Sequence, residues 1–122
     1  MTTSVLLVDD DPDIRELIAT LLAARGYEVT TASNGLEALE SLRRASMLPA
    51  LILLDVMMPK MDGWAFRAAQ VRNERLAAIP VVLLSASSDV DQLALERGMT
   101  GSVRKPFGLK ELLAAVRRHS KH

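Results

Sequence analysis

The sequence predicts an α/β fold, a doubly wound parallel sheet of five strands that alternate with five helices. Short, fully apolar runs, such as 51–54 and 81–84, suit strands that are buried on both faces. Segments with apolar residues at three- and four-residue spacing lie between these runs, as expected of helices that cover a sheet. Because the two patterns alternate strictly, right-handed crossovers between parallel strands are favoured.

Length and composition indicate one globular domain. At 122 residues, with 49% hydrophobic and 25% charged residues, the chain can bury a core of its own. We expect a single domain over residues 1–122, because neither a linker nor a repeat beyond the strand–helix period is visible. The apolar runs are far too short to span a bilayer, so no membrane association is expected.

Charge and cysteine content exclude several kinds of function. The 15 basic and 15 acidic residues give a formal charge of zero, so we expect no direct binding of nucleic acid by this chain. No cysteine is present, which rules out disulfides and thiolate metal sites. The N-terminus lacks the pattern of a signal peptide, and a cytoplasmic location is therefore expected.

The first half of the chain predicts two strand–helix units. A strand at 5–8 leads to a helix capped by Asp11, with Pro12 at its first position. A strand at 29–32 leads to a second helix, for which Asn34 and Glu37 resemble a capping box. Gly26 should end the first helix. The predicted apolar faces contain Ile14, Leu17, Ile18, Leu21 and Leu22 in the first helix and Leu36, Leu39 and Leu42 in the second.

The second half predicts three further units. A strand over 51–54 ends on Asp55, and a loop through 59–63 precedes a helix at about 64–73, with Trp64 and Phe66 as packing residues. A strand over 80–84 runs into Ser85, and Asp89 is the predicted cap of a fourth helix that ends at Gly98. The fifth strand is predicted at 101–104. The inward residues of the last two helices are Val90, Leu93 and Ala94, and Leu109, Leu112, Leu113 and Val116.

Polar residues directly follow four of the predicted strands. Because the carboxyl ends of parallel strands meet at one edge of a sheet, these residues should lie together. They are Asp9, Asp10, Asp55, Ser85 and Lys105. Taken singly, each has an ordinary explanation as a helix cap, a turn residue or a surface lysine.

The chemistry of this group favours a divalent cation and phosphoryl transfer. Three neighbouring carboxylates repel one another unless a cation compensates them, and oxygen ligands suit Mg²⁺ or Mn²⁺ better than zinc. His119 and His122 fall in the last four residues, and we expect no metal role for them. Beside such an ion Asp55 could act as a nucleophile toward a phosphoryl group, whose oxygens Lys105 and Ser85 would bind.

The motifs at these positions resemble those of the receiver domain of two-component response regulators, over about residues 4–118. The motifs are Val8-Asp9-Asp10, Leu54-Asp55 with Met58-Pro59 and Asp62-Gly63, Leu84-Ser85-Ala86, and Lys105-Pro106-Phe107. The resemblance implies a flavodoxin-like sheet with strand order 2-1-3-4-5. It also implies a cis peptide bond before Pro106.

The resemblance further implies a phosphorylation switch. Asp55 would accept a phosphoryl group from a sensor histidine kinase or a phosphotransfer protein, and the switch would act on a downstream protein partner. Asp9, Asp10, Asp55 and the backbone carbonyl of Met57 would hold Mg²⁺, with Ser85 as the switch hydroxyl and Lys105 as the phosphate-binding lysine. Such a domain catalyses only its own phosphorylation and dephosphorylation and is no turnover enzyme.

Two departures from the family leave an alternative open. Ser102 stands where the family usually carries Tyr or Phe, and the interval from Ser85 to Gly98 is about two residues short. A short or displaced fourth helix follows, and we do not expect signalling through the family's usual symmetric dimer on that face. A degenerate receiver that acts as a phosphorylation-independent scaffold is therefore the main alternative.

Two other classes fit less well. A Mg²⁺-dependent phosphohydrolase commonly has a second acid two residues after its aspartyl nucleophile, and Met57 stands there. A flavin-binding module would need a phosphate-binding loop after the first strand, which this chain lacks.

Overall fold

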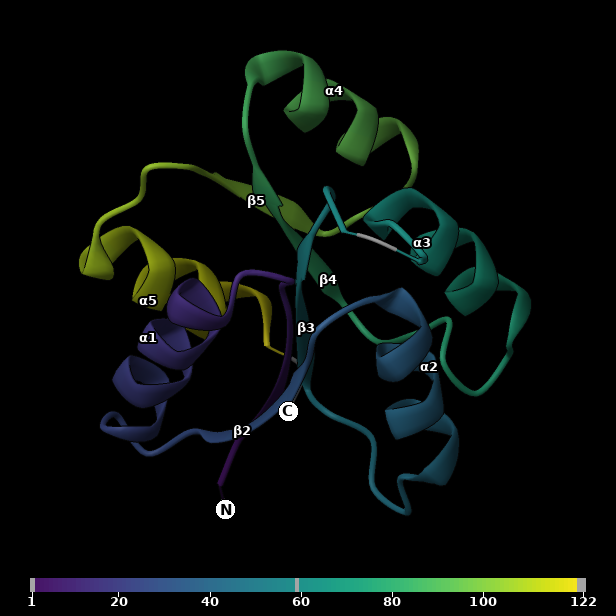
Figure 1. Ribbon diagram of the computed structural model, residues 1–122, viewed down its shortest axis with the longest axis horizontal. Coiled ribbons are helices and arrows are strands. Elements are labelled where there is room, and N and C mark those ends of the chain that lie inside the picture. Colours follow the sequence, from purple (N-terminus) through teal and green to yellow (C-terminus); the bar gives the residue numbers. More distant parts are fainter. Residues whose placement is uncertain (1, 59, 121–122) are drawn as a thin grey trace.

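The computed structural model describes residues 2–58 and 60–120, in which five strands alternate with five helices (Figure 1). The elements are, in order, β1 (Ser4–Val8), α1 (Pro12–Ala23), β2 (Glu28–Ala32), α2 (Gly35–Arg44), β3 (Leu51–Asp55), α3 (Gly63–Arg72), β4 (Val81–Ser85), α4 (Ser88–Glu96), β5 (Gly101–Arg104) and α5 (Leu109–His119). The sequence predicts a loop at Pro59 and no metal role for His122. Both residues lie outside the described residues.

The strands form one parallel sheet in the order β2-β1-β3-β4-β5, which confirms the expected topology. The register aligns the carboxyl ends of the three central strands. Val8 pairs with Leu54, and Asp55 pairs with Leu84. Ser85, the last residue of β4, pairs with Arg104, the last residue of β5. The residues that follow these strands therefore emerge at the same edge of the sheet.

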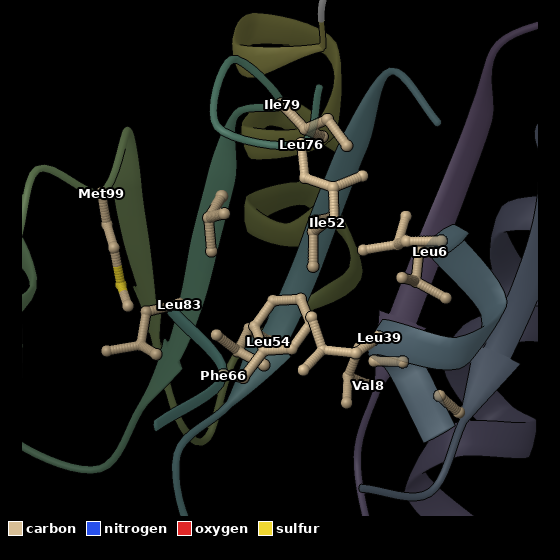
Figure 2. Packing of buried hydrophobic residues seen from close by; sticks show 14 of the residues in the cluster. Leu6, Val8, Leu39, Ile52, Leu54, Phe66, Leu76, Ile79, Leu83 and Met99 are labelled. Carbon is tan, nitrogen blue, oxygen red and sulfur yellow. The ribbon is translucent and has the colours of Figure 1, made fainter. Parts of the chain in front are cut away.

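Helices cover both faces of the sheet, with α1 and α5 on one face and α2, α3 and α4 on the other (Figure 1). Alternate strand residues serve the two faces: Leu53 packs with the α1 and α5 side chains, and Leu54 packs with those of α2, α3 and α4. Figure 2 shows the second of these clusters, with the ring of Phe66 beside Leu54 and Leu39. Burial on both faces explains why every residue of β3 and β4 before the last one is apolar.

The apolar faces of the first two helices differ from the prediction. Leu17 is 56% exposed and Leu36 is 47% exposed, although the spacing predicts both on the apolar faces that cover the sheet. The buried face of α2 consists instead of Gly35, Ala38, Leu39 and Leu42, at spacings of three and four residues. Two small residues complete this face because α2 approaches the backbone of Met61, whose carbonyl oxygen accepts a hydrogen bond from the Gly35 N–H.

Two predicted helix caps also need correction. Asn34 does cap α2 by accepting from the Glu37 N–H, but the Glu37 carboxylate turns back to the hydroxyl and N–H of Ser33, outside a standard capping box. Ser87, and not Asp89, caps α4 by accepting from the Val90 N–H. The helix therefore begins two residues earlier than predicted. At nine residues α4 is the shortest of the five described helices.

An arginine on α3 secures the C-terminal end of α4. The Arg67 guanidinium donates to the carbonyl oxygens of Arg97 and Gly98, at 3.3 and 3.0 Å. Arg97 in turn lies over the ring of Trp64, 5.7 Å from its centroid. Helix α4 is thus tied to its neighbour at one end, and its other end lies beside the strand ends that carry the predicted site.

Within residues 2–58 and 60–120, none of the helices has the length and apolar character needed to cross a membrane.

Candidate phosphoacceptor site

Three acids meet at the carboxyl edge of the sheet, as the sequence predicts. Asp9 and Asp10 follow β1, and Asp55 ends β3, the neighbouring strand. One carboxylate oxygen from each lies within 4.8 Å of the other two. Asp9 is fully buried, Asp55 is 8% exposed, and Asp10 lies in the open. The site therefore contains one solvent-exposed carboxylate, that of Asp10, and two buried ones, those of Asp9 and Asp55.

The loop after β1 holds Asp9 in place through local hydrogen bonds. The Asp11 N–H donates to Asp9 Oδ1 at 2.9 Å, and Asp11 itself caps α1 by accepting from the N–H groups of Asp13 and Ile14. The guanidinium of Arg15, on the first turns of α1, donates to the Asp9 carbonyl oxygen at 2.8 Å. The start of α1 therefore positions the acidic loop.

Lys105 enters the same site from the end of β5. Its Nζ lies 3.6 Å from Asp9 Oδ2 and 3.6 Å from Asp55 Oδ1. Its backbone N–H donates to the Ser85 carbonyl oxygen at 2.8 Å, which extends the pairing of β4 and β5 by one bond. The peptide bond between Lys105 and Pro106 is cis, as the resemblance implies.

The electrostatics of the site are unfavourable to Asp55 when it is ionised. Burial and then the neighbouring charge of Asp9 raise the pKa of Asp55, and the Lys105 ammonium and the Met57 N–H oppose this only in part. The Met57 N–H lies 3.4 Å from Asp55 Oδ1. One lysine faces three acids, so the ionised site has an excess of negative charge.

The donor set fits a divalent cation. The three carboxylates could together bind a metal ion, with oxygen ligands only. Asp9 Oδ2 is buried and accepts no hydrogen bond from the part of the chain that the structure describes; Lys105 lies at ion-pair distance from it, beyond hydrogen-bonding range. A buried carboxylate oxygen without a hydrogen-bond donor, on a residue that clusters with two other acids, is the feature expected of a cation ligand. Metal binding by the Met57 carbonyl stays a prediction.

A cleft of about 480 Å³ opens over the three acids. Its lining residues are Asp9, Asp10, Asp11, Asp55, Val56, Met57, Leu84, Ala86, Val90 and Lys105. Since a water molecule takes about 30 Å³ of liquid volume, the cleft has room for a hydrated cation and a phosphoryl group together. The Met57 side chain is 75% exposed at the mouth of this cleft.

Ser85 lies at the predicted strand end, but its hydroxyl is hydrogen-bonded to Asp91 and not to Asp9, Asp10 or Asp55 within the described residues. It is fully buried, is absent from the lining of the cleft, and donates to Asp91 Oδ1 at 2.5 Å. The other oxygen of Asp91 pairs with Arg104 Nη2 at 2.6 Å. The hydrogen bonds from Ser85 and Arg104 lower the pKa of Asp91, which is therefore ionised at neutral pH.

Asp91 and Arg104 are the polar residues that the sequence prediction missed. Arg104 precedes Lys105 directly and stands opposite Ser85 in the register, so an observer with the correct strand pairing could have linked the two. Asp91 carried a weaker signal, because a helix capped by Asp89 would place Asp91 at its second position, whereas the helix capped by Ser87 places it at the fourth. His119, by contrast, lies beside Gly101 at the opposite end of β5 from the site.

Comparisons with known proteins agree with this geometry. Residues 5–117 match the response regulator receiver domain family. The chain is 42% identical over 117 residues to the transcriptional regulatory protein CpxR homolog of Haemophilus influenzae, covering 94% of this chain and 49% of that protein. It is 44% identical over 115 residues to the probable transcriptional regulator ycf27 of Porphyra purpurea, covering 93% and 45%. The chain thus spans about half of the length of these relatives.

Two solved structures show the same fold over nearly their full length. The chemotaxis response regulator CheY4 of Vibrio cholerae superposes with a TM-score of 0.87 and 34% identity, covering 97% of this chain and 98% of that one. The receiver domain of the Francisella response regulator 1452 gives a TM-score of 0.85 and 31% identity, covering 96% and 95%. The fold, the acidic cleft with its lysine and the sequence match together establish that the chain belongs to the response regulator receiver domain family of two-component signalling.

Proposed function

We propose that the chain is a phosphoacceptor whose Asp55 takes a phosphoryl group in a Mg²⁺-dependent reaction. The observation that carries the proposal is the position of Asp55: its carboxylate lies 3.6 Å from Lys105 Nζ and within ligand distance of Asp9 and Asp10, in an open cleft. A nucleophilic carboxylate, a lysine for phosphoryl oxygens and a cation site are the parts that phosphoryl transfer to an aspartate needs.

The transfer forms one bond and breaks one. An Asp55 carboxylate oxygen attacks phosphorus, the bond from phosphorus to the donor breaks, and the donor leaves with the electron pair. Asp9, Asp10, Asp55 and the Met57 carbonyl would hold Mg²⁺, which would neutralise charge on the transferring oxygens. Lys105 would bind one phosphoryl oxygen as a point charge, and the Ser85 hydroxyl would donate to another.

The partners follow from family membership. We propose a sensor histidine kinase or a phosphotransfer protein as the donor, and a downstream protein partner whose binding depends on the phosphoryl group. The relatives are named transcriptional regulators, but this chain covers only half of each, and its zero formal charge favours no direct contact with nucleic acid. Residues 1–122 would form one receiver domain in the cytoplasm. This domain would catalyse only its own phosphorylation and dephosphorylation.

Intact mass spectrometry tests the proposal. The protein is incubated with acetyl phosphate and Mg²⁺, beside the variant Asp55→Asn. The wild type should gain one phosphoryl group and lose it on treatment with hydroxylamine, which cleaves acyl phosphates, and Asp55→Asn should gain none. If the folded wild type stays unmodified by acetyl phosphate and by histidine kinases alike, the proposal fails. The phosphorylation-independent scaffold, which the exposed Ser102 favours, would then be the better account.

A further inference from the structure

The contact between Ser85 and Asp91 joins the phosphoryl site to helix α4. Ser85 ends β4 at the level of Asp55, because Asp55 pairs with Leu84 across the sheet. Asp91 lies in the first turns of α4, and its Oδ1 accepts a hydrogen bond from the Ser85 hydroxyl at 2.5 Å. Its Oδ2 accepts a hydrogen bond from Arg104 Nη2, at the end of β5, at 2.6 Å. One carboxylate thus connects β4, β5 and α4.

A serine hydroxyl has one proton, so Ser85 cannot donate to Asp91 and to a phosphoryl oxygen at the same time. Asp91 cannot return a proton, because its pKa is lowered by Ser85 and Arg104 and the ionised carboxylate only accepts. Donation to a phosphoryl group on Asp55 must therefore break the bond to Asp91. The bond is charge-assisted and half-buried, so breaking it opposes the phosphorylated state.

We propose that Asp91 is a positioning residue for Ser85: it holds the hydroxyl away from the phosphoryl site until transfer, and loses this hydrogen bond when Asp55 is phosphorylated. The inference rests on the proposed function, since it needs a phosphoryl group on Asp55. Release of the hydroxyl removes the Ser85 donor from Asp91 and leaves its ion pair with Arg104, so the start of α4 responds directly to the phosphoryl group. Helix α4 is fixed at its other end by Arg67, which confines the response to the first turns.

The test is a mutant cycle on the rate of phosphorylation by acetyl phosphate with Mg²⁺, followed by intact mass. Asp91→Ala should be labelled about fivefold faster than the wild type, the factor that corresponds to one hydrogen bond of ordinary net strength. In the Ser85→Ala background the same replacement should change the rate by less than about twofold, because no hydroxyl remains to be released. A merely structural role of Asp91 would give the same factor in both backgrounds.

Asp89→Ala is the matched control. It removes an acid from the same turn of α4, and within the described residues the Asp89 side chain makes no hydrogen bond or ion pair. Its labelling rate should equal that of the wild type, which separates the hydrogen bond from the general effect of one lost negative charge. Asp91→Asn keeps the shape of the side chain and so guards against a perturbation of α4 by alanine. Its labelling rate should lie between those of Asp91→Ala and the wild type.

The outcomes separate the two proposals. A wild type that is labelled on Asp55, together with an Asp91→Ala rate equal to that of the wild type or of Asp89→Ala, overturns this inference and leaves the proposed function standing. An Asp91 effect that persists in Ser85→Ala also overturns it. A folded wild type that is not labelled by acetyl phosphate or by any kinase overturns the proposed function and this inference with it.

Discussion

Lys105 Nζ lies 3.6 Å from Asp55 Oδ1, between that carboxylate and the buried Asp9. This ammonium group is held by a loop that leaves β5 next to Ser85, whose carbonyl oxygen accepts from the Lys105 N–H. One positive charge does not balance the acids around it, and the pKa of Asp55 stays raised because burial and Asp9 outweigh Lys105. The site therefore disfavours its own ionised nucleophile unless a cation binds.

Asp55→Asn should raise the free energy of unfolding of the metal-free protein at pH 7. Because the pKa of Asp55 is higher in the folded than in the unfolded chain, the folded state keeps a proton at pH values where the unfolded state has lost it. The contribution of Asp55 to stability thus falls as pH rises from about 4, the unfolded value, through the folded pKa. Urea denaturation in EDTA, at pH 7 and pH 4, measures the free energy of unfolding of the wild type and of Asp55→Asn.

The difference between Asp55→Asn and the wild type should shrink at pH 4, where the unfolded carboxyl is itself about half protonated. The difference should also shrink in saturating Mg²⁺. The wild type binds the ion with three acids and is stabilised by it, whereas Asp55→Asn has only two of these acids. An Asp55→Asn variant that is less stable than the wild type in EDTA at pH 7 would contradict this account of the site.

Mg²⁺ should raise the midpoint of thermal unfolding, because it binds the folded arrangement of acids and not the unfolded chain. At a concentration of one hundred times Kd the gain is about 2.7 kcal/mol, or roughly 10 °C for a domain of this size. Differential scanning fluorimetry over a Mg²⁺ titration measures the shift. Asp10→Asn, which removes the exposed ligand, should weaken it.

Asp11→Asn is the control for the Mg²⁺ titration. Asp11 lines the same cleft but is not one of the three clustered acids, and asparagine keeps the cap of α1. It should retain the shift of the wild type. Equal shifts in the wild type, Asp10→Asn and Asp11→Asn would indicate general screening of charge in place of a metal site.

Gly63→Ala should destabilise the fold and slow phosphorylation together. A Cβ atom at this position would lie 2.8 Å from the Asp55 carbonyl oxygen and 2.9 Å from Val56 Cα, both backbone atoms that cannot move without displacing the site. Overpacking of this kind costs about 1–3 kcal/mol. Denaturation and acetyl phosphate labelling measure the two effects.

Gly108→Ala serves as the comparison for Gly63→Ala. Among the residues that the structure describes, its Cβ atom would meet only the Glu111 side chain, at 4.0 Å. A loss of up to about 1 kcal/mol is expected, since Gly108 occupies the cap position of α5 and alanine is a poorer cap. Its labelling rate should be that of the wild type. Equal labelling rates in Gly63→Ala and the wild type would show that the Asp55 backbone tolerates the added methyl group.

Gln70→Leu should cost about 2–4 kcal/mol of stability. Gln70 is fully buried, and its Nε2 donates to the carbonyl oxygens of Leu76 and Ile79, both at 3.0 Å. Leucine fills the same space but leaves both carbonyls unsatisfied and removes the acceptor of Arg67. Gln92→Leu, at an exposed position on α4, should change stability by less than about 0.5 kcal/mol. Equal stabilities of the two variants in urea would contradict the role of these bonds.

Much of the fold could be predicted from the sequence because the parallel sheet imposes its own pattern. Buried runs such as 51–54 and 81–84 mark the central strands, and each is ended by a polar residue. Once the strands are known to be parallel, their ends must meet, and Asp9, Asp55 and Lys105 do lie together. The roles assigned to these residues stay predictions until phosphorylation is measured.

The direction of the Ser85 hydroxyl could not be predicted in the same way. It depends on which residue of α4 faces the end of β4, and that is decided by the helix start. With Asp89 as the cap, Asp91 would stand in a different place; with Ser87 as the cap, it reaches Ser85. Caps among neighbouring serines and aspartates differ too little in free energy for the sequence alone to choose between them.

Buried polar residues were missed for a related reason. Gln70 lies within the predicted third helix, but its partners are carbonyl groups of the segment 76–79, whose path depends on turns at Asn73. Periodicity reports which face of a helix is apolar and does not report where an irregular backbone offers acceptors.

The most direct test of the account is the identity of the modified residue. After labelling with acetyl phosphate and Mg²⁺, borohydride reduces an acyl phosphate to an alcohol, so the phosphorylated aspartate becomes homoserine and can be located by tandem mass spectrometry of peptides. The account predicts homoserine at Asp55 alone, with Asp9 and Asp10 unchanged. Homoserine at Asp9 or Asp10, with Asp55 intact, would contradict it.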